Sequence, residues 1–305
     1  MFQCFLPTTR WFRAIIIAIL AIILFISYAS PVIAQQDNRN FIQVFIEEAQ
    51  LVLKGRAQRK ELTKPNGSPR GGGFRGDCPE LIALGKDEIP LTAFVPVIPE
   101  EQPSSSKSDD VSLSKLNYVW GQTTEEYPTF WFYIPYVYKK SEVGYGKFVL
   151  LDKDKHSVAG PIFVKIPEEQ PSIGKFTLPE SAKPLKNKEY IWYFSIICDP
   201  LKPSRNPGVT GWIEKVTSRF LPVKDYQYYA QQGIWYDTVT RLFNSQNSQT
   251  QQLQQNKILL IKYIFSSVIE KPQKEEDFNY EEKLNQIAER IASFEPQILK
   301  PIQFQ

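Results

Sequence analysis

Short apolar runs separated by proline, glycine and polar turns occupy the chain between residues 76 and 218. Brief apolar and aromatic runs bounded by turn residues are typical of antiparallel strands, so this spacing predicts about seven short β-strands. The runs are LTAFVPVI (91–98), NYVW (117–120), YPTFWFYIPYVY (127–138), KFVLLD (147–152), GPIFVKIP (160–167), SIGKFTLP (172–179), EYIWYFSIICD (189–199) and VTGWIEKV (209–216).

After residue 218 the apolar positions recur at helical spacing instead. Helices are predicted over 225–243, 257–271 and 279–294, with a polar low-complexity connection at 244–257. The clearest apolar stripe consists of Leu284, Ile287, Ile291 and Phe294. A further short amphipathic helix is predicted over 41–53.

Together these patterns predict an α+β protein, in which an antiparallel β-sandwich, Ig-like or related, precedes a helical C-terminal segment. The expected organisation is a signal peptide (1–34), a short helix with a Gly/Arg/Pro-rich linker (35–75), the β-sandwich domain (76–218) and the helical segment (219–305).

The N-terminus has the pattern of a signal peptide, because Arg10 and Arg13 precede a 17-residue apolar run and PVIA. Cleavage is expected after Ala34, which predicts an exported protein, periplasmic or extracellular. The alternative is an uncleaved membrane anchor. Removing the two arginines lowers the net charge from +3 to +1, which argues against nucleic-acid binding.

Cys78 and Cys198 are the cysteines that remain after this cleavage. Two cysteines in an exported chain predict one disulfide bond between them. The loop it would close spans 120 residues, and loop-entropy arguments allow about 4 to 5 kcal/mol of stabilisation.

Both faces of two predicted strands are apolar and aromatic, although a half-buried strand should alternate. In TFWFYIPY (129–136), Trp131 and Tyr133 point one way and Phe130 and Phe132 the other. In the later strand, Trp192 shares a face with Tyr190 and Phe194. We expect the faces with Trp131, Tyr133 and Trp192 either to lie beneath the C-terminal helices or to form an open platform that binds a glycan or a partner.

The stretches PTFWFYIPY, WYFSIICDP and GIWYD, with GDCP and GWIEKV, resemble a family of exported cyanobacterial proteins known as domain of unknown function 928. The resemblance covers roughly residues 70 to 245. It implies export, a β-rich core and a trailing helical segment, and it supplies no catalytic residues.

Candidate chemistry is sparse. His156, the one histidine, lies in a predicted turn with Asp152 and Asp154; the start of a calcium loop is present there, but the required glycine and later ligands are missing, so no metal and no cofactor are expected. Glu125 and Glu126 precede the aromatic strand and could serve as the carboxylate pair of a glycoside hydrolase.

The leading hypothesis is therefore an exported, non-enzymatic binding or cell-envelope-associated module that contacts an envelope protein or an extracellular glycan. A carbohydrate-active hydrolase with Glu125 or Glu126 beside Trp131 is the alternative. A membrane-tethered structural protein is the third reading, and no membrane span is expected once the signal peptide is removed.

Overall fold

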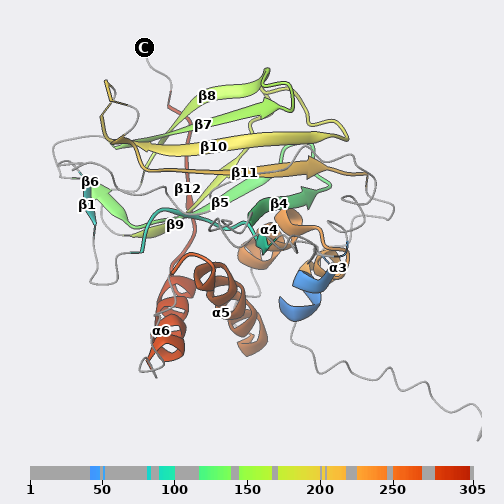
Figure 1. The fold of residues 1–305 in the computed structure, drawn as a ribbon, viewed down its shortest axis with the longest axis vertical. Coiled ribbons are helices and arrows are strands. Elements are labelled where there is room, and N and C mark those ends of the chain that lie inside the picture. The colour runs from blue at the N-terminus through green and yellow to red at the C-terminus, as the bar shows by residue number, and fades with distance from the viewer. Residues whose placement is uncertain are drawn as a thin grey trace, which may run out of the picture. The chain divides into compact units, whose positions relative to one another are not determined.

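The computed structural model shows two mixed β-sheets and a set of helices, an α+β arrangement (Figure 1). All described residues belong to the unit Phe41–Gln305. The structure describes residues 42–48, 51, 81–83, 89–99, 117–138, 144–166, 171–199, 201–202, 205–217, 225–245, 250–269 and 279–302.

Each predicted apolar run contains a strand. The strands are β1 (Leu81–Ala83), β2 (Thr92–Ala93), β3 (Val97–Pro99), β4 (Asn117–Thr123), β5 (Thr129–Ile134), β6 (Tyr136–Tyr138), β7 (Tyr145–Asp152), β8 (Ser157–Lys165), β9 (Ser172–Thr177), β10 (Glu189–Ile197), β11 (Gly208–Lys215) and β12 (Gln297–Ile298). The long run 127–138 divides into β5 and β6 at Pro135, because proline has no backbone N–H to donate to a neighbouring strand.

The strand order is β3-β4-β11-β10-β7-β8 in a six-stranded sheet, β12-β9-β5-β2 in a four-stranded sheet, and β1-β6 in a small pair. Most neighbours are antiparallel, but β4 pairs parallel with β11 and β12 parallel with β9, so the prediction of a purely antiparallel arrangement is corrected. Neither of these pairs is joined by a tight turn, and only a hairpin turn forces two strands to be antiparallel. The finer Ig-like sandwich stays a prediction.

The helices are α3 (Tyr226–Gln231), α4 (Trp235–Asn244), α5 (Gln251–Ser266) and α6 (Tyr280–Ala292), with further helical residues at 42–48. The helix predicted over 225–243 is divided, because Gly233 takes a left-handed φ of 68° that favours glycine and ends α3. The low-complexity prediction for 244–257 is wrong in its second half: α5 begins at Gln251, and Leu253 and Asn256 are buried.

One hydrophobic cluster fills the space between the two large sheets, and we call it the inter-sheet cluster. Phe132 of β5 stacks on Phe194 of β10 with ring centroids 4.1 Å apart, and Phe130 lies 4.7 Å from Phe148 of β7. All four rings are buried, so the strand faces that are rich in phenylalanine are the ones that point into the inter-sheet cluster.

A second cluster, the helix–sheet cluster, lies between the other face of β5 and the helices. Trp131 and Tyr133 contribute to it from β5, and Phe243, Phe265 and Ile291 contribute from α4, α5 and α6. Phe45 of the N-terminal helical segment stacks on Trp235 with centroids 4.3 Å apart. Strand β5 is therefore the middle layer between sheet and helices.

The C-terminal residues connect the edges of the two large sheets. β12 pairs with β9, the backbone N–H of Ile302 then donates to Phe163 of β8, and the N–H of Lys165 donates to Lys300. Leu299 between them is buried in the inter-sheet cluster. Across the described part of the chain, no helix combines the length and apolarity that a membrane crossing requires.

Candidate functional site

The predicted aromatic platform is not present at Trp131, Tyr133 and Trp192. Their exposed fractions are 3%, 2% and 0%. Trp131 and Tyr133 lie in the helix–sheet cluster, whereas Trp192 lies in the inter-sheet cluster, so the three side chains do not share a surface. The expectation of cover by the C-terminal helices holds for Trp131 and Tyr133. Trp192 is covered by the opposite sheet instead.

The polar atoms of these buried rings bond to α4. The indole N–H of Trp131 donates to Thr240 Oγ1 at 3.0 Å, and that of Trp192 donates to the Tyr236 hydroxyl at 2.7 Å. The Tyr236 hydroxyl in turn donates to the backbone oxygen of Trp212 at 3.0 Å. Buried indole and phenol groups usually need such partners, so these contacts fix α4 against β5, β10 and β11.

Trp235, the neighbouring residue of α4, completes this attachment. The indole N–H of Trp235 donates to the backbone oxygen of Phe94 at 2.9 Å. A Cβ added at Gly121 of β4 would lie 2.8 Å from the Cβ of Trp235, so the close approach of α4 to β4 requires glycine there. The GIWYD stretch is thus a structural attachment point, with each of its last three residues bonded to a different strand or loop.

Asp237, the last residue of that stretch, is a buried carboxylate on α4 with an exposed fraction of 1%. Its oxygens accept from the Thr123 hydroxyl at 2.6 Å, from the backbone N–H of Thr124 at 2.9 Å and from the Thr124 hydroxyl. Burial raises the pKa of Asp237 above its ordinary value, Glu125 adds to the rise, and the three donors oppose it.

Glu125 and Glu126, the proposed hydrolase carboxylates, are both exposed in the loop after β4. Glu125 pairs with Arg241 of α4 at 3.2 Å. Arg241 also lies 4.0 Å from the ring centroid of Tyr229 and donates to its hydroxyl at 3.1 Å. The glutamates therefore flank a polar junction between helix and loop, and the Trp131 ring is not exposed beside them.

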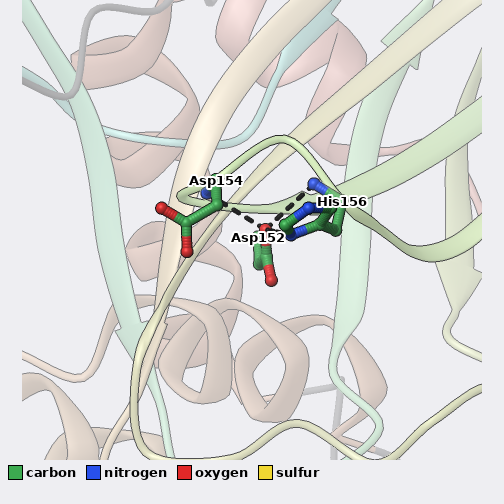
Figure 2. Close-up of side chains that lie close together, drawn as sticks. All are labelled: Asp152, Asp154 and His156. Atoms are coloured by element: carbon green, nitrogen blue, oxygen red, sulfur yellow. Dashed lines mark hydrogen bonds and ion pairs between the residues drawn. The ribbon is translucent and has the colours of Figure 1, made fainter.

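The β7–β8 turn brings together Asp152, Asp154 and His156, whose ligand atoms lie within 4.8 Å of one another (Figure 2). Asp152 Oδ1 accepts from the backbone N–H groups of Asp154 and His156, both at 3.0 Å, and Oδ2 pairs with Lys188 at 3.3 Å. Desolvation opposes the shift, but these three contacts lower the pKa of Asp152 below its ordinary value. The cluster is the hydrogen-bonded turn that an aspartate at this position stabilises.

The outward face of the six-stranded sheet contains the feature that the sequence interpretation missed. Tyr193 of β10 is 41% exposed and is the one exposed aromatic residue among the side chains that the structure describes. Other outward positions of β7, β8, β10 and β11, by burial pattern and register, are Tyr145, Lys147, Val149, Leu151, Phe163, Ile191, Ser195 and Thr210. The alternation of side chains along β10 could have indicated this face, because it places Tyr193 on the face of the strand that points away from Trp192.

Several predictions fall on residues outside the described part. Cys198 is buried at the end of β10, but Cys78 is not described, so their pairing stays a prediction. The signal peptide and its cleavage after Ala34 also lie outside the described residues.

Comparison with known proteins places the chain in a family. No curated protein and no solved structure matches it. The family model described as Domain of Unknown Function (DUF928) matches residues 70–272, about two thirds of the chain. This match includes every strand from β1 to β11 and the helices α3 to α5. The chain belongs to this family.

Proposed function

We propose that this protein is an exported, non-enzymatic binding module of the cell envelope that binds a glycan on the outward face of its six-stranded sheet. The observation that carries this proposal is the composition of that face: Tyr193 is 41% exposed and is surrounded by half-buried apolar and hydroxyl side chains. Contiguous apolar area on a protein surface commonly marks a binding site.

The polar neighbours of Tyr193 favour a sugar over a protein as the ligand. Thr210 and Val149 lie directly opposite Tyr193 in the neighbouring strands, and Ser195 lies opposite Lys147. A flat ring with a polar tip, next to hydroxyl and ammonium groups, offers both a stacking surface and hydrogen-bond partners. The centre of a protein–protein interface is usually more uniformly apolar and depleted of lysine.

Titration of the purified mature protein with peptidoglycan fragments and a panel of neutral and acidic polysaccharides tests this proposal. Replacing Tyr193 with Ala should weaken glycan binding at least about tenfold, and Tyr193→Trp should retain it. Ile298→Ala is the matched control, because Ile298 is 63% exposed and belongs to the other sheet. Equal affinity of wild type and Tyr193→Ala would refute the site, and capture of a protein that depends on Tyr193 would replace the glycan.

The alternative is a carbohydrate-active hydrolase, and one observation favours it. Asp237 is a carboxyl group near Glu125 whose pKa is raised by burial, and a carboxylic acid with a raised pKa is what the general acid of a glycoside hydrolase requires. Against it, Asp237 is 1% exposed and bonded to three donors. Turnover of any glycan in the same panel, abolished by Glu125→Gln or Glu126→Gln, would establish the hydrolase in place of the binding module.

Export and the disulfide are parts of the same proposal and have their own test. The intact mass of the protein purified from its producing cell should correspond to a chain that begins at Gln35, and peptide mapping without reductant should recover Cys78 joined to Cys198. An N-terminus at Met1 would instead support the membrane-tethered structural protein.

A further inference from the structure

Lysine side chains continue the exposed surface that begins at Tyr193. Strands β10, β7 and β8 lie next to one another at one edge of the six-stranded sheet (Figure 1). Lys147 of β7 lies directly opposite Ser195, which is two positions beyond Tyr193 in β10. Lys165 of β8 lies opposite Tyr145, which is two positions before Lys147. Because side chains two positions apart share a face, Tyr193, Lys147 and Lys165 form a diagonal line across three adjacent strands.

This diagonal line combines aromatic and cationic side chains over the length of more than one sugar unit. Both strand pairs are antiparallel, and diagonal neighbours in such pairs are about 7 to 8 Å apart, which gives about 15 Å from Tyr193 to Lys165. Lys165 is exposed and Lys147 is half-buried. Beside the line, the half-buried rings of Tyr145 and Phe163 meet edge to face with centroids 5.8 Å apart.

The charges on this face are divided between its two ends. No hydrogen bond or ion pair to another described residue engages the Lys147 side chain. The outward carboxylates of β10 and β11, Glu189 and Glu214, lie opposite each other at the far end of that strand pair. Glu189 is four positions from Tyr193, about 13 Å along an extended strand. Among the described side chains, the line from Tyr193 to Lys165 is therefore positive, although the whole chain has a formal net charge of only +3.

We infer that the glycan bound at Tyr193 is an acidic one, in which a uronic-acid carboxylate is bound by Lys147. This inference rests on the proposed glycan-binding function and names the class of glycan. Lys147 and Ser195 are directly opposed, so the two oxygens of one carboxylate can accept from the ammonium and the hydroxyl while a neighbouring sugar ring stacks on Tyr193. Hydrogen bonds between charged groups are stronger than those between neutral groups, so this contact favours an acidic sugar over its neutral counterpart.

The test compares two ligands that differ at the carboxyl group alone. The full mature chain is titrated, by calorimetry, with galacturonic-acid oligosaccharides and with the methyl esters of the same oligosaccharides. The acidic form should bind about tenfold more tightly at low ionic strength, and the difference should shrink as added NaCl screens the charges. Equal affinity for the two forms, or tighter binding of the ester, would overturn the inference.

Three variants locate the effect. Lys147→Gln should weaken binding of the acidic form about fivefold and leave binding of the ester unchanged, whereas Tyr193→Ala should weaken both. Lys183→Gln is the matched control, because it removes the same charge from an exposed lysine in the connection between β9 and β10 and should change neither affinity. Equal losses in Lys147→Gln and Lys183→Gln would show attraction by overall charge and would overturn the inference.

Failure of this inference and failure of the proposed function give different results. Binding that depends on Tyr193 but favours the neutral polysaccharides of the panel would overturn the acidic ligand and leave the glycan-binding function in place. If no glycan of the panel bound in a way that depends on Tyr193, the proposed function would be refuted, and this inference with it.

Discussion

The two faces of β5 bury aromatic side chains in different ways. Toward the six-stranded sheet, Phe130 and Phe132 contact other rings and have no polar atoms to satisfy. Toward the helices, Trp131 is equally buried, but its N–H donates to Thr240 of α4. A strand that is aromatic on both faces is here the middle of three layers. Phenylalanine faces the sheet, and side chains with polar tips face the helices that supply acceptors.

The largest expected effect comes from breaking the sheet-facing side. Phe132→Ala should lower the free energy of unfolding by about 3 to 5 kcal/mol, because it leaves a cavity among fully buried rings. Urea denaturation of the mature protein measures this, and Phe132→Leu, which keeps most of the volume, should lose much less. A loss below about 1 kcal/mol for Phe132→Ala would mean that the inter-sheet cluster does not hold the fold together.

The next effect concerns the attachment of α4 on the other side. Asp237→Ala should lower the free energy of unfolding by about 1 to 3 kcal/mol, since the donors of Thr123 and Thr124 would lose their acceptor. Asp237→Asn keeps one oxygen acceptor and should lose less. Hydrogen exchange should show the protection of α4 falling before that of β10, and equal loss in both elements would contradict a separable helix layer.

The pH dependence of stability separates the two kinds of buried contact further. Because burial raises the pKa of Asp237, its contribution is fully present below the ordinary aspartate value of 3.8 and is lost as pH rises through the raised value. Asp237→Asn should remove that decline, whereas Phe132→Leu should leave it unchanged. Urea midpoints at a series of pH values measure the slope, and an unchanged slope in Asp237→Asn would place its origin elsewhere.

Asp152 in the β7–β8 turn is the matched control, because its pKa is shifted in the opposite direction. The backbone N–H groups and Lys188 lower the pKa of Asp152, so its contribution is present above pH 3.8 and is lost as pH falls through the lowered value. Asp152→Asn should therefore flatten only the acidic end of the profile. If Asp152→Asn and Asp237→Asn changed the pH profile of stability in the same way, this would contradict the opposite pKa shifts assigned to the two carboxyl groups.

Strand positions could be predicted from the sequence because apolar runs and proline breaks act locally. The order of the strands could not, since the parallel pairing of β4 with β11 joins residues more than 80 positions apart. The N-terminal part of α5 was missed because QQLQQNK has few apolar residues. Tertiary contacts stabilise it instead, with Leu253 and Asn256 buried and the Asn256 amide bonded to Tyr226.

The sequence analysis identified the aromatic residues of these strands as important, but it left open which part of the protein or which ligand covers them. Sequence alternation identifies the two faces of β5 but not the element that packs on each. Trp192 shows this limit of sequence alternation. It lies on the Phe-rich face of β10, which points into the inter-sheet cluster, yet its N–H donates to Tyr236 of α4 in the helix layer. Tyr193 was overlooked for the converse reason: a single exposed tyrosine is ordinary in sequence and becomes informative only beside its cross-strand neighbours.

The smallest expected effect isolates the polar bond that distinguishes the helix-facing side of β5. Trp131→Phe keeps a large ring but removes the N–H that donates to Thr240, so it should cost about 1 kcal/mol. Thr240→Val removes the acceptor, and the double variant should cost less than the sum of the two single changes if the bond contributes to stability. Full additivity would show that the buried ring alone, as on the phenylalanine side, holds α4 in place.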